Sequence, residues 1–372
     1  MRILQLGKFY PILGGVEKVE WDLMTGLSAQ DVDCDMLCAM VEGSSRDIVL
    51  NQHARLIGCH ALRKVAATMI SPAMIFKLRK IRRNYDIIHV HHPDPMACLA
   101  LFLSGYKGKV ILHWHSDIEK QKQLLKLYRP LQDWLIRRAD LIVGTTPVYT
   151  AESPYLQDVQ HKVATLPIGV DPINPNPEAV EKLRAAYPGK KIVFTLGRLV
   201  PYKGYKYLIE AARYLPDDYV VLIGGSGPLR DELSEQITLC DVQHKVKLLG
   251  RISDADLPAY FGACHLFCLR SIQKTEAFGI VQLEAMSCGK PVVATTIPHS
   301  GVAWVNADGE SGVNVPPHNA KALAEAITGI CGDPDKYAAL SAGALARFTT
   351  TFTKSAMIAR VLTLYRQTLN SH

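Results

Sequence analysis

The sequence predicts an α/β protein with two doubly wound domains, each a mostly parallel sheet covered by helices. The chain has 372 residues, which is more than a single hydrophobic core usually organises. Short apolar runs alternate with helical patterns in both halves, as they do where parallel strands are joined by helices. We therefore expect two domains of similar size with a ligand cleft between them.

The first half contains apolar runs that we interpret as buried parallel strands. They start at residue 2, end near Gly169, and read RILQLG, CDMLCAM, DIIHVHH, KVILHWH, LIVGTT and KVATLPIG. The N-terminal run is too short for a signal peptide or a membrane span. These strands predict a first domain over residues 1–172.

The stretch Val170–Val180 is rich in proline and asparagine and has no helix or strand period, so we interpret it as a linker. The strands after it read KIVFTLGR, YVVLIGG, KVKLLGR, HLFCLRS, PVVATT and GVNVPP, and they predict a second domain over residues 173–353. Residues 354–372 form a helical pattern with a stripe made by Met357, Val361, Leu362 and Leu364. This helix either crosses back to cover the first domain or packs on its own domain.

The charge balance favours an anionic ligand or an anionic membrane surface. Lys and Arg total 42 against 35 Asp and Glu, a formal net charge of +7. Nucleic acid is a weaker interpretation, because no RNA-binding signature or zinc knuckle accompanies the charge. The nine cysteines include no C-x2-C pair, so we expect reduced thiols in a cytoplasmic protein.

Glycine-rich turns and cations follow several predicted strands. The pair Gly14–Gly15 lies between the first strand and a helical pattern, where backbone N–H groups can approach a diphosphate. In the second half, Arg198 and Lys203 lie in one loop, and Gly224–Pro228 and Gly250–Ser253 form two more. Arginine binds phosphate oxygens with its fork, and lysine adds a point charge. Because ligands collect at the carboxyl ends of parallel strands, these loops predict a nucleotide pocket.

Two acids, Glu276 and Glu284, surround a predicted helix start. Gly279, Ile280 and Val281 between them would present free N–H groups to phosphate, and Glu284 would lie about two turns inside the helix. A glutamate among apolar neighbours is costly to bury without a partner. The pattern predicts one acid for sugar hydroxyls and the other for a ribose.

Taken together, the segments GGVE, GRLVPYKG, GGSGPL and EAFGIVQLEAMSCGKPVVAT resemble those of the retaining glycosyltransferases of family 4. The resemblance runs through nearly the whole chain in the right order. It implies the GT-B fold, in which two Rossmann-like doubly wound domains face a central cleft, and a donor site in the second domain.

The resemblance also implies a role for each position. Arg198 and Lys203 would hold the diphosphate, Glu276 would act in catalysis by holding sugar hydroxyls near the reacting carbon, and Glu284 would hold the ribose. The other donor-binding positions would be Gly15, which would touch the phosphates from the first domain, Arg251 and Ile252 in the base-contacting loop, and Phe278, Gly279, Ile280 and Val281.

The family further places a catalytic histidine at the end of a first-domain strand, beside the donor sugar. The segment HWHSD offers His113 and His115, and the Ser116 and Asp117 that follow make His115 the better match. Strand alternation puts both histidines on one face, so His113 stays an alternative.

Clustered imidazoles are common metal ligands, so His89, His91 and His92 raise a metal-site alternative. The family needs no metal and no cofactor, so we expect neither. We interpret these histidines as part of the acceptor side, and Asp-x-Asp matches such as Asp254/Asp256 as chance.

The segment SPAMIFKLRKIRRNYD predicts a basic amphipathic helix that docks on an anionic membrane. Its cations are Lys77, Arg79, Lys80, Arg82 and Arg83, and its apolar residues are Met74, Ile75, Phe76, Leu78 and Ile81. A solvated basic helix face is the alternative, and the family resemblance favours the membrane.

The resemblance therefore implies a retaining, metal-independent hexosyltransferase, with front-face attack by the acceptor hydroxyl. We expect an α-mannosyltransferase that uses GDP-mannose and a lipid-diphosphate-linked or polysaccharide acceptor in bacterial O-antigen or lipopolysaccharide assembly. Its place would be the inner face of the cytoplasmic membrane. The alternatives are a UDP-sugar-dependent enzyme of the same fold and a non-catalytic nucleotide-sugar-binding scaffold at the membrane.

Overall fold

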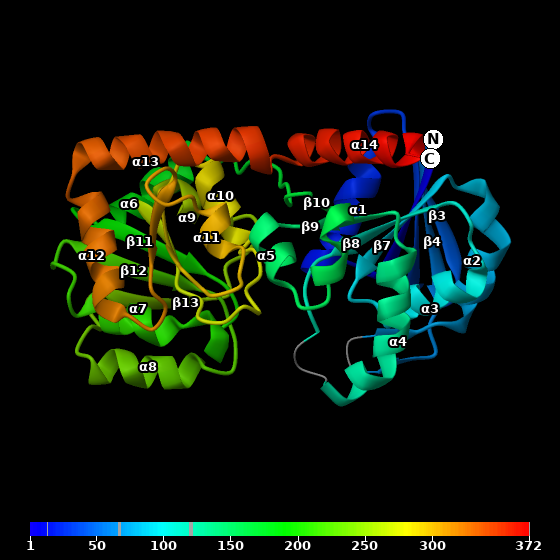
Figure 1. The fold of residues 1–372 in the computed structure, drawn as a ribbon. Helices are drawn as coiled ribbons and strands as arrows, with labels where there is room; N and C mark the ends of the chain where they lie inside the picture. The colour runs from blue at the N-terminus through cyan, green and yellow to red at the C-terminus, as the bar shows by residue number, and fades with distance from the viewer. Residues whose placement is uncertain (13, 66–67, 119–121, 372) are drawn as a thin grey trace. The chain divides into compact units, whose positions relative to one another are not determined.

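The computed structural model describes residues 1–12, 14–65, 68–118 and 122–371. The chain divides into two compact units, the first made of Met1–Ile168 with the C-terminal helix α14 (Lys354–Asn370) and the second of Gly169–Thr353 (Figure 1). The division falls slightly before the boundary expected at residue 172. Each unit has a mostly parallel sheet with helices packed on it, so the prediction of two Rossmann-like α/β domains is confirmed.

Among the described residues, the sheet of the first unit has the order β10-β9-β8-β7-β1-β2-β4-β3, with only β3 antiparallel to its neighbour. Its strands are β1 (Arg2–Tyr10), β2 (Asp33–Met40), β3 (Arg46–Asn51), β4 (Ala54–His60), β7 (Ile87–His92), β8 (Lys109–Trp114), β9 (Leu141–Gly144) and β10 (Val163–Thr165). The strand order changes direction between β1 and β7. In doubly wound sheets, ligands collect at the carboxyl ends of strands at such a switch point.

The strands between β2 and β7 were not predicted from the sequence. They are β3 and β4 of the main sheet and a separate hairpin of β5 (Arg63–Val65) and β6 (Thr68–Ile70). β3 is an exposed edge strand, so it has no buried apolar run to mark it. The segment is joined to the main sheet by β4, which pairs in parallel with β2.

The helices of the first unit are α1 (Gly15–Ser28), α2 (Pro72–Ile81), α3 (Pro95–Ser104), α4 (Lys122–Arg138) and α5 (Pro147–Glu152), with 3-10 turns η1 (Arg82–Asn84) and η2 (Gln157–Lys162). Local signals explain their ends, as in α3, which Asp94 caps through the N–H groups of Met96 and Ala97. No helix in the described parts of the chain combines the length and the apolar character that crossing a membrane requires.

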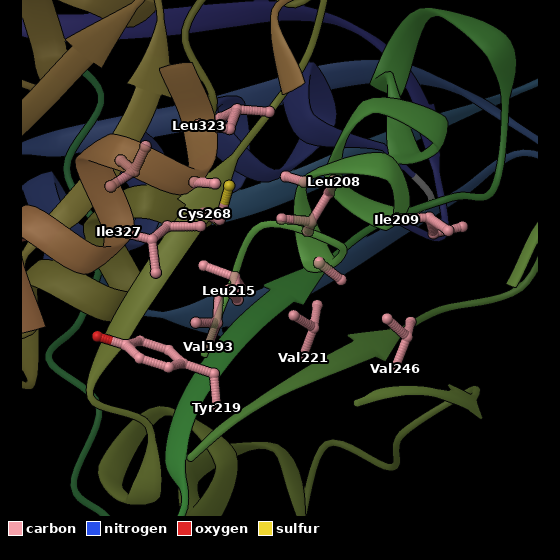
Figure 2. Packing of buried hydrophobic residues seen from close by; sticks show 14 of the residues in the cluster. Val193, Leu208, Ile209, Leu215, Tyr219, Val221, Val246, Cys268, Leu323 and Ile327 are labelled. Atoms are coloured by element: carbon pink, nitrogen blue, oxygen red, sulfur yellow. The ribbon is translucent and has the colours of Figure 1, made fainter. Parts of the chain in front are cut away.

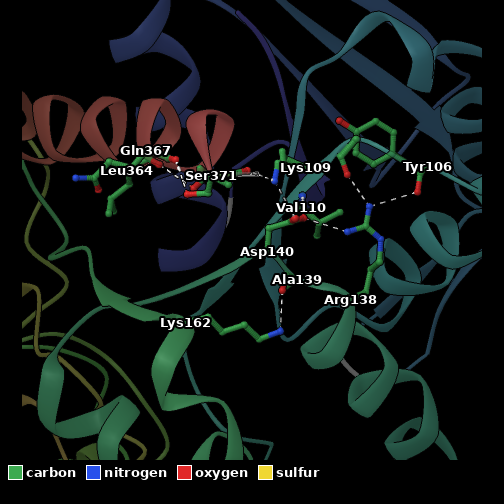
Figure 3. Close-up of polar contacts among 12 residues, drawn as sticks. Tyr106, Lys109, Val110, Arg138, Ala139, Asp140, Lys162, Leu364, Gln367 and Ser371 are labelled. Carbon is green, nitrogen blue, oxygen red and sulfur yellow. Dashed lines mark hydrogen bonds and ion pairs between the residues drawn. The ribbon is translucent and has the colours of Figure 1, made fainter.

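The C-terminal helix α14 packs on the first unit, against α1. Lys354 forms an ion pair with Asp22 at 3.2 Å, and Gly26 leaves room for Ile358. At the other end, the ammonium of Lys109 donates to the carbonyl of Ser371 at 2.8 Å and lies 3.5 Å from Asp140 (Figure 3). Of the two placements that the helical stripe left open, the structure has the one that crosses back.

The sheet of the second unit has the order β13-β12-β11-β14-β15-β16 among the described residues, with parallel pairing throughout. This is the 3-2-1-4-5-6 order of the Rossmann fold, with its switch point between β11 and β14. The strands are β11 (Lys191–Leu196), β12 (Tyr219–Gly224), β13 (Val246–Gly250), β14 (Leu266–Leu269), β15 (Val292–Thr295) and β16 (Gly312–Val315).

The helices of the second unit are α6 (Pro177–Ala185), α7 (Tyr205–Ala212), α8 (Arg230–Leu239), α9 (Leu257–Ala263), α10 (Val281–Ser287), α11 (Val302–Val305), α12 (Ala320–Cys331) and α13 (Pro334–Arg347), with η3 (Pro201–Lys203) and the π-turn η4 (Phe348–Phe352). Figure 2 shows the core between α7, α12 and the sheet, where Leu208 and Leu323 face Val193 and Val221. The predicted linker was wrong beyond Asn176, whose side chain caps α6 directly before Pro177.

Candidate active site

The three glycine-containing loops of the second unit, here called the glycine loops (residues 197–204, 224–228 and 250–252), are joined to one another. They follow β11, β12 and β13, which lie side by side in the sheet. Gly197 N–H donates to the Gly224 carbonyl at 3.1 Å, and Gly225 N–H donates to the Gly250 carbonyl at 2.7 Å. The predicted convergence of these loops is therefore present.

Two glycines of these loops allow backbone contacts that a side chain would prevent. Gly225 has φ +128°, and a Cβ there would lie 1.9 Å from the carbonyl oxygen of Gly197. Gly204 has φ +66°, and a Cβ there would lie 2.3 Å from the carbonyl oxygen of Arg270. Glycine is thus required where the loops meet each other and the end of β14.

Lys203 and Glu276 form an ion pair at the switch point of this sheet. The Lys203 ammonium and the Ser271 hydroxyl, at 2.9 Å, both donate to Oε2 of Glu276. The side chains of Lys203 and Glu276 are only 11% and 12% exposed, so each charge is largely removed from water. Among the described residues, the other carboxylate oxygen, Oε1, has no hydrogen-bond partner and can accept a hydroxyl of a ligand.

A buried arginine that the sequence analysis missed lies beside this pair. Arg270 follows β14, is fully buried, donates to the Thr195 hydroxyl at 2.6 Å and stacks on the Tyr205 ring with its guanidinium carbon 3.4 Å from the centroid. Within the described chain its Nε and Nη2 have no hydrogen-bond partner. The signal in the sequence was a single cation at the end of the apolar run HLFCL, which is a position where charge is expensive.

The segment after Glu276 presents free backbone N–H groups. Gly279 has φ +73°, and α10 begins only at Val281. In the described structure no hydrogen bond starts from the N–H groups of Gly279, Ile280 or Val281. Unpaired N–H groups before a helix start are able to bind an anion, and the predicted phosphate contact of these three residues stays a prediction.

The later helix start places Glu284 in the first turn of α10, so the expectation of two turns inside the helix was wrong. The carboxylate has no hydrogen-bond partner among the described residues, and burial, with a smaller contribution from Asp254, raises its pKa to about 7. Because the native pKa lies above the usual carboxyl value, this group lowers the free energy of unfolding as the pH rises toward 7. A ligand that donates hydroxyls to the carboxylate would relieve this cost.

Of the remaining predicted donor-binding residues of the second unit, Arg198, Arg251 and Ile252 lie on the glycine loops, and Phe278 lies in the segment after Glu276. Arg198 and Arg251 are exposed, and Phe278 is buried against Phe352, with ring centroids 6.0 Å apart. Ile252 packs over Gly224, because a Cβ added at Gly224 would lie 2.6 Å from Cδ1 of Ile252. The apolar surface beside a cation at this loop is suited to a flat base.

In the first unit, four histidines make a buried histidine cluster (His89, His91, His113 and His115) at the ends of β7 and β8. The rings of His113 and His115 stack 3.9 Å apart, so the two lie on one face as strand alternation predicts. His115, the first residue after β8, keeps 7% exposure while the other three are fully buried. Asp117 anchors the following loop by accepting from Trp114 Nε1 at 2.9 Å.

With these sites in place, comparison with known proteins decides the family. The family described as Glycosyltransferase Family 4 matches residues 13–173, and Glycosyl transferases group 1 matches residues 178–347. The D-rhamnosyltransferase WbpZ of Pseudomonas aeruginosa is 30% identical over 360 residues, which cover 95% of this chain and 92% of that protein. The chain belongs to glycosyltransferase family 4.

A further full-length relative agrees with the assignment, and solved structures show the fold. The O-antigen chain mannosyltransferase C of Escherichia coli is 29% identical over 377 residues, covering both chains in full. Anabaena HepE, solved in complex with UDP, aligns over 99% of this chain and 100% of that one with a TM-score of 0.77 at 23% identity. WaaG, a glycosyltransferase of lipopolysaccharide biosynthesis, aligns over 96% and 98% with a TM-score of 0.67 at 16% identity. These solved structures establish the GT-B fold.

The histidines that lie close enough to hold a metal ion are not the same three that the sequence offered. His92 points to the opposite side of β7 from His89 and His91, stacks on Trp114 at 3.8 Å and pairs with Gln132, so it does not join them in the alternative set of metal ligands. His89, His91 and His113 instead have ligand atoms within 4.8 Å of one another, close enough to hold a metal ion. Both ring nitrogens of His91 are already hydrogen-bonded, however, so it has no lone pair free for a metal.

Gly15 is the first residue of α1 and is exposed, next to Glu17, whose carboxylate lies 4.0 Å from the Lys8 ammonium. It therefore lies at a helix N-terminus, where backbone N–H groups can meet an anion. The phosphate contact of Gly15 that the resemblance to family 4 implies stays a prediction.

The predicted membrane helix is α2, and only part of it is a free surface. Met74 and Leu78 are fully buried in the first unit, and Lys77 pairs with Asp47 at 3.2 Å. Arg82 lies in η1, is partly buried and donates to the carbonyl of Arg79. The exposed set is Phe76, at 72% exposure, with Arg79, Lys80 and Arg83.

Proposed function

We propose that this protein is a retaining, metal-independent α-mannosyltransferase that uses GDP-mannose and acts in the assembly of a bacterial surface polysaccharide. The observation that carries the proposal is the largely buried Lys203–Glu276 ion pair beside the free N–H groups of residues 279–281. These groups lie at the switch point of a Rossmann-type sheet, where such folds bind nucleotides.

The charges of the second unit fit the reaction. When a nucleoside diphosphate leaves, negative charge grows on its phosphate oxygens, and preorganised cations and N–H groups stabilise it. Lys203, Arg198 and the free N–H groups supply this positive potential from the protein itself, which is why no metal is needed. Oε1 of Glu276 can accept a sugar hydroxyl while Oε2 stays paired with Lys203. Attack from the face that the leaving group vacates then retains the anomeric configuration.

The names of the two full-length relatives support the choice of donor. One is a mannosyltransferase of an O-antigen chain and the other a D-rhamnosyltransferase. D-rhamnose is 6-deoxymannose, so both sugars share the axial 2-hydroxyl of mannose. We therefore propose a GDP-linked mannose donor and a lipid-linked or polysaccharide acceptor of the O-antigen type.

A donor panel tests the function. The protein is mixed with GDP-mannose, UDP-glucose, UDP-galactose and UDP-N-acetylglucosamine in the presence of EDTA, and melting temperature and slow donor hydrolysis are recorded. We expect GDP-mannose alone to raise the melting temperature and to be hydrolysed, because a ligand that binds only the native state stabilises it. A response to a UDP-sugar would overturn the donor, and binding without any turnover would favour a scaffold.

Glu284 predicts a pH dependence of donor binding. A carboxylate that accepts ribose hydroxyls must be ionised, yet the pKa of Glu284 in the free protein is about 7. The affinity for GDP-mannose should therefore rise between about pH 6 and about pH 8, by up to about tenfold per unit below the pKa. Isothermal titration calorimetry measures this directly, since the diphosphate of a nucleotide sugar does not titrate in this range.

Two variants separate this effect from other titrations. Glu284→Gln should give a flat pH profile, and Asp254→Asn should move the profile to lower pH because it removes a negative charge that raises the Glu284 pKa. An unchanged slope in Glu284→Gln would assign the dependence to another group.

We further propose that the exposed face of α2 docks on anionic lipid at the inner surface of the cytoplasmic membrane. Phe76 projects from the helix among Arg79, Lys80 and Arg83, and beside it Arg46, Lys77 and Lys80 line a groove of about 620 Å³. An exposed aromatic ring among cations is the pattern of an interfacial helix. Headgroup phosphates are the anions that these side chains would meet.

The membrane proposal predicts salt-sensitive sedimentation with vesicles that contain phosphatidylglycerol. Replacing Arg79, Lys80 and Arg83 by glutamine should reduce the bound fraction strongly, because each cation near an anionic surface contributes about 1 kcal/mol. A control variant with Arg213, Arg230 and Lys321 replaced by glutamine lowers the net charge equally from exposed sites of the second unit. Equal losses in both variants would show general attraction rather than docking through α2.

A further inference from the structure

A continuous chain of hydrogen bonds leads from the first strand of the protein to His115. Gln5 Oε1 on β1 lies 2.8 Å from Nε2 of His91 on β7, and Nδ1 of His91 lies 2.9 Å from Nε2 of His115. Gln5 and His91 are fully buried, and β1 and β7 are the two strands at the switch point of this sheet. The chain therefore ends at the place where a ligand of the first unit is expected.

The burial of the His91 and His115 rings gives this chain of hydrogen bonds a direction. Removal from water, with smaller effects from neighbouring imidazoles, holds the pKa of His91 and His115 well below the usual histidine value. Each ring is then neutral at physiological pH and has one N–H and one lone pair. The direction of one hydrogen bond consequently fixes the tautomer of every ring after it.

The direction is set at Gln5. Its Nε2 donates to the hydroxyl of Tyr365 at 3.1 Å and points toward Cys34 Sγ at 3.6 Å, which leaves Oε1 to accept from His91. Nε2 of His91 therefore holds the proton, and Nδ1 accepts from Nε2–H of His115. Tyr365, from the C-terminal helix, also lies 2.6 Å from Nδ1 of His89, so its hydroxyl is held from two sides.

We propose that Gln5 and Tyr365 are positioning residues that hold His115 in the Nε2–H tautomer, so that its Nδ1 lone pair accepts a hydrogen bond from a sugar hydroxyl. The proposal rests on the proposed function for the identity of the ligand, whereas the tautomer itself does not depend on it. A neutral acceptor selects a ligand that can donate, which favours a free hydroxyl over a carbonyl or an ether oxygen.

Nuclear magnetic resonance of the wild-type protein tests the tautomer without any assay of activity. Long-range proton–nitrogen correlation of protein labelled with ¹⁵N-histidine distinguishes protonated from unprotonated ring nitrogens, and loss of one signal set in His115→Asn assigns the residue. We expect Nε2 of His115 protonated and Nδ1 unprotonated. The opposite tautomer in the wild-type protein would overturn the proposal.

Variants along the chain test the role of each link. Gln5→Leu removes the acceptor, so both tautomers of His115 should appear and kcat/KM should fall roughly 10-fold or more, the effect of one hydrogen bond. His91→Asn keeps a carbonyl oxygen close to the place of Nδ1, so it should retain the tautomer and most of the activity, whereas His91→Leu should lose both.

Tyr365→Phe should have a smaller effect of the same kind as Gln5→Leu. Arg366→Gln, an exposed neighbour on the same helix, should change neither.

The outcomes separate this inference from the proposed function. A protein with the expected tautomer that transfers no sugar would contradict the function and leave the positioning chain in place. A sugar transferase whose His115 tautomer is unchanged in Gln5→Leu would keep its function and lose this inference. If Gln5→Leu or His91→Leu fails to fold, the wild-type tautomer still decides the question.

Discussion

Replacement of Lys203 by methionine is expected to lower kcat for sugar transfer by about 10²- to 10³-fold, the cost of removing one preorganised donor from a site of developing negative charge. Methionine keeps most of the volume of the lysine stem, whereas the contact of the ammonium with the Tyr202 ring, 5.6 Å from its centroid, is lost with the charge. The change removes the ammonium that pairs with Glu276, and among the described residues the carboxylate then keeps only the hydrogen bond from Ser271. Steady-state kinetics with GDP-mannose measure kcat, and the melting temperature shows whether the variant is folded.

Lys206→Met is the matched control, because Lys206 lies three positions further along the chain and is exposed. It loses the same charge from the same unit without touching Glu276, so its kcat should stay close to that of the wild type. A normal kcat in folded Lys203→Met, or an equal loss in Lys206→Met, would remove Lys203 from the reaction.

Replacement of Gly225 by alanine is expected to destabilise the second unit by about 3 kcal/mol or more, which corresponds to a fall in its melting temperature of about 6 to 12 °C. The new Cβ would lie 1.9 Å from the backbone oxygen of Gly197, and a backbone atom cannot rotate away as a side chain can. The two glycine loops would have to separate, so donor binding should be lost together with stability. Differential scanning calorimetry with and without GDP-mannose measures both effects.

Gly329→Ala provides the opposite expectation within the same unit. Gly329 is an exposed residue of α12, and the nearest heavy atom to its new Cβ would be Nζ of Lys336 at 3.9 Å. Alanine should raise stability by about 0.5 to 1 kcal/mol, because it is the better helix former. A Gly225→Ala protein as stable as Gly329→Ala would show that the loops tolerate separation.

Strands that could be predicted from the sequence are buried along most of their length, and the strand at the exposed edge could not be predicted. β11, β12 and β15 are buried along nearly their whole length, so a continuous apolar run marks them. β3 lies at the edge of its sheet with most side chains exposed, and such a strand has no run to recognise. The start of α6 was missed although Asn176 and Pro177 form a common helix start, because the proline-rich composition was interpreted as a linker.

The candidate site likewise contains residues that the sequence predicted and residues that it did not. Arg198, Lys203, Glu276 and Glu284 stand in short motifs whose neighbours reveal their chemistry, and the structure places all four on the loops and helix at the edge of one sheet. Arg270 has no motif of its own, and its contacts with Thr195 and Tyr205 exist only because β14 lies beside β11. The partners of the buried histidines likewise come from other strands.

Sequence patterns were enough to predict the two α/β domains, the loops that carry glycines and cations, and the pair of glutamates around a helix start. Each of these is encoded by residues within a few positions of one another, where period, turn chemistry and motif spacing act. Two features become visible in the folded chain alone: α14 packs on the first unit, and Gln5 and Tyr365, 360 positions apart, meet beside His91. Such contacts depend on the order of strands in a sheet and on which surface a helix covers, and no local pattern contains that information.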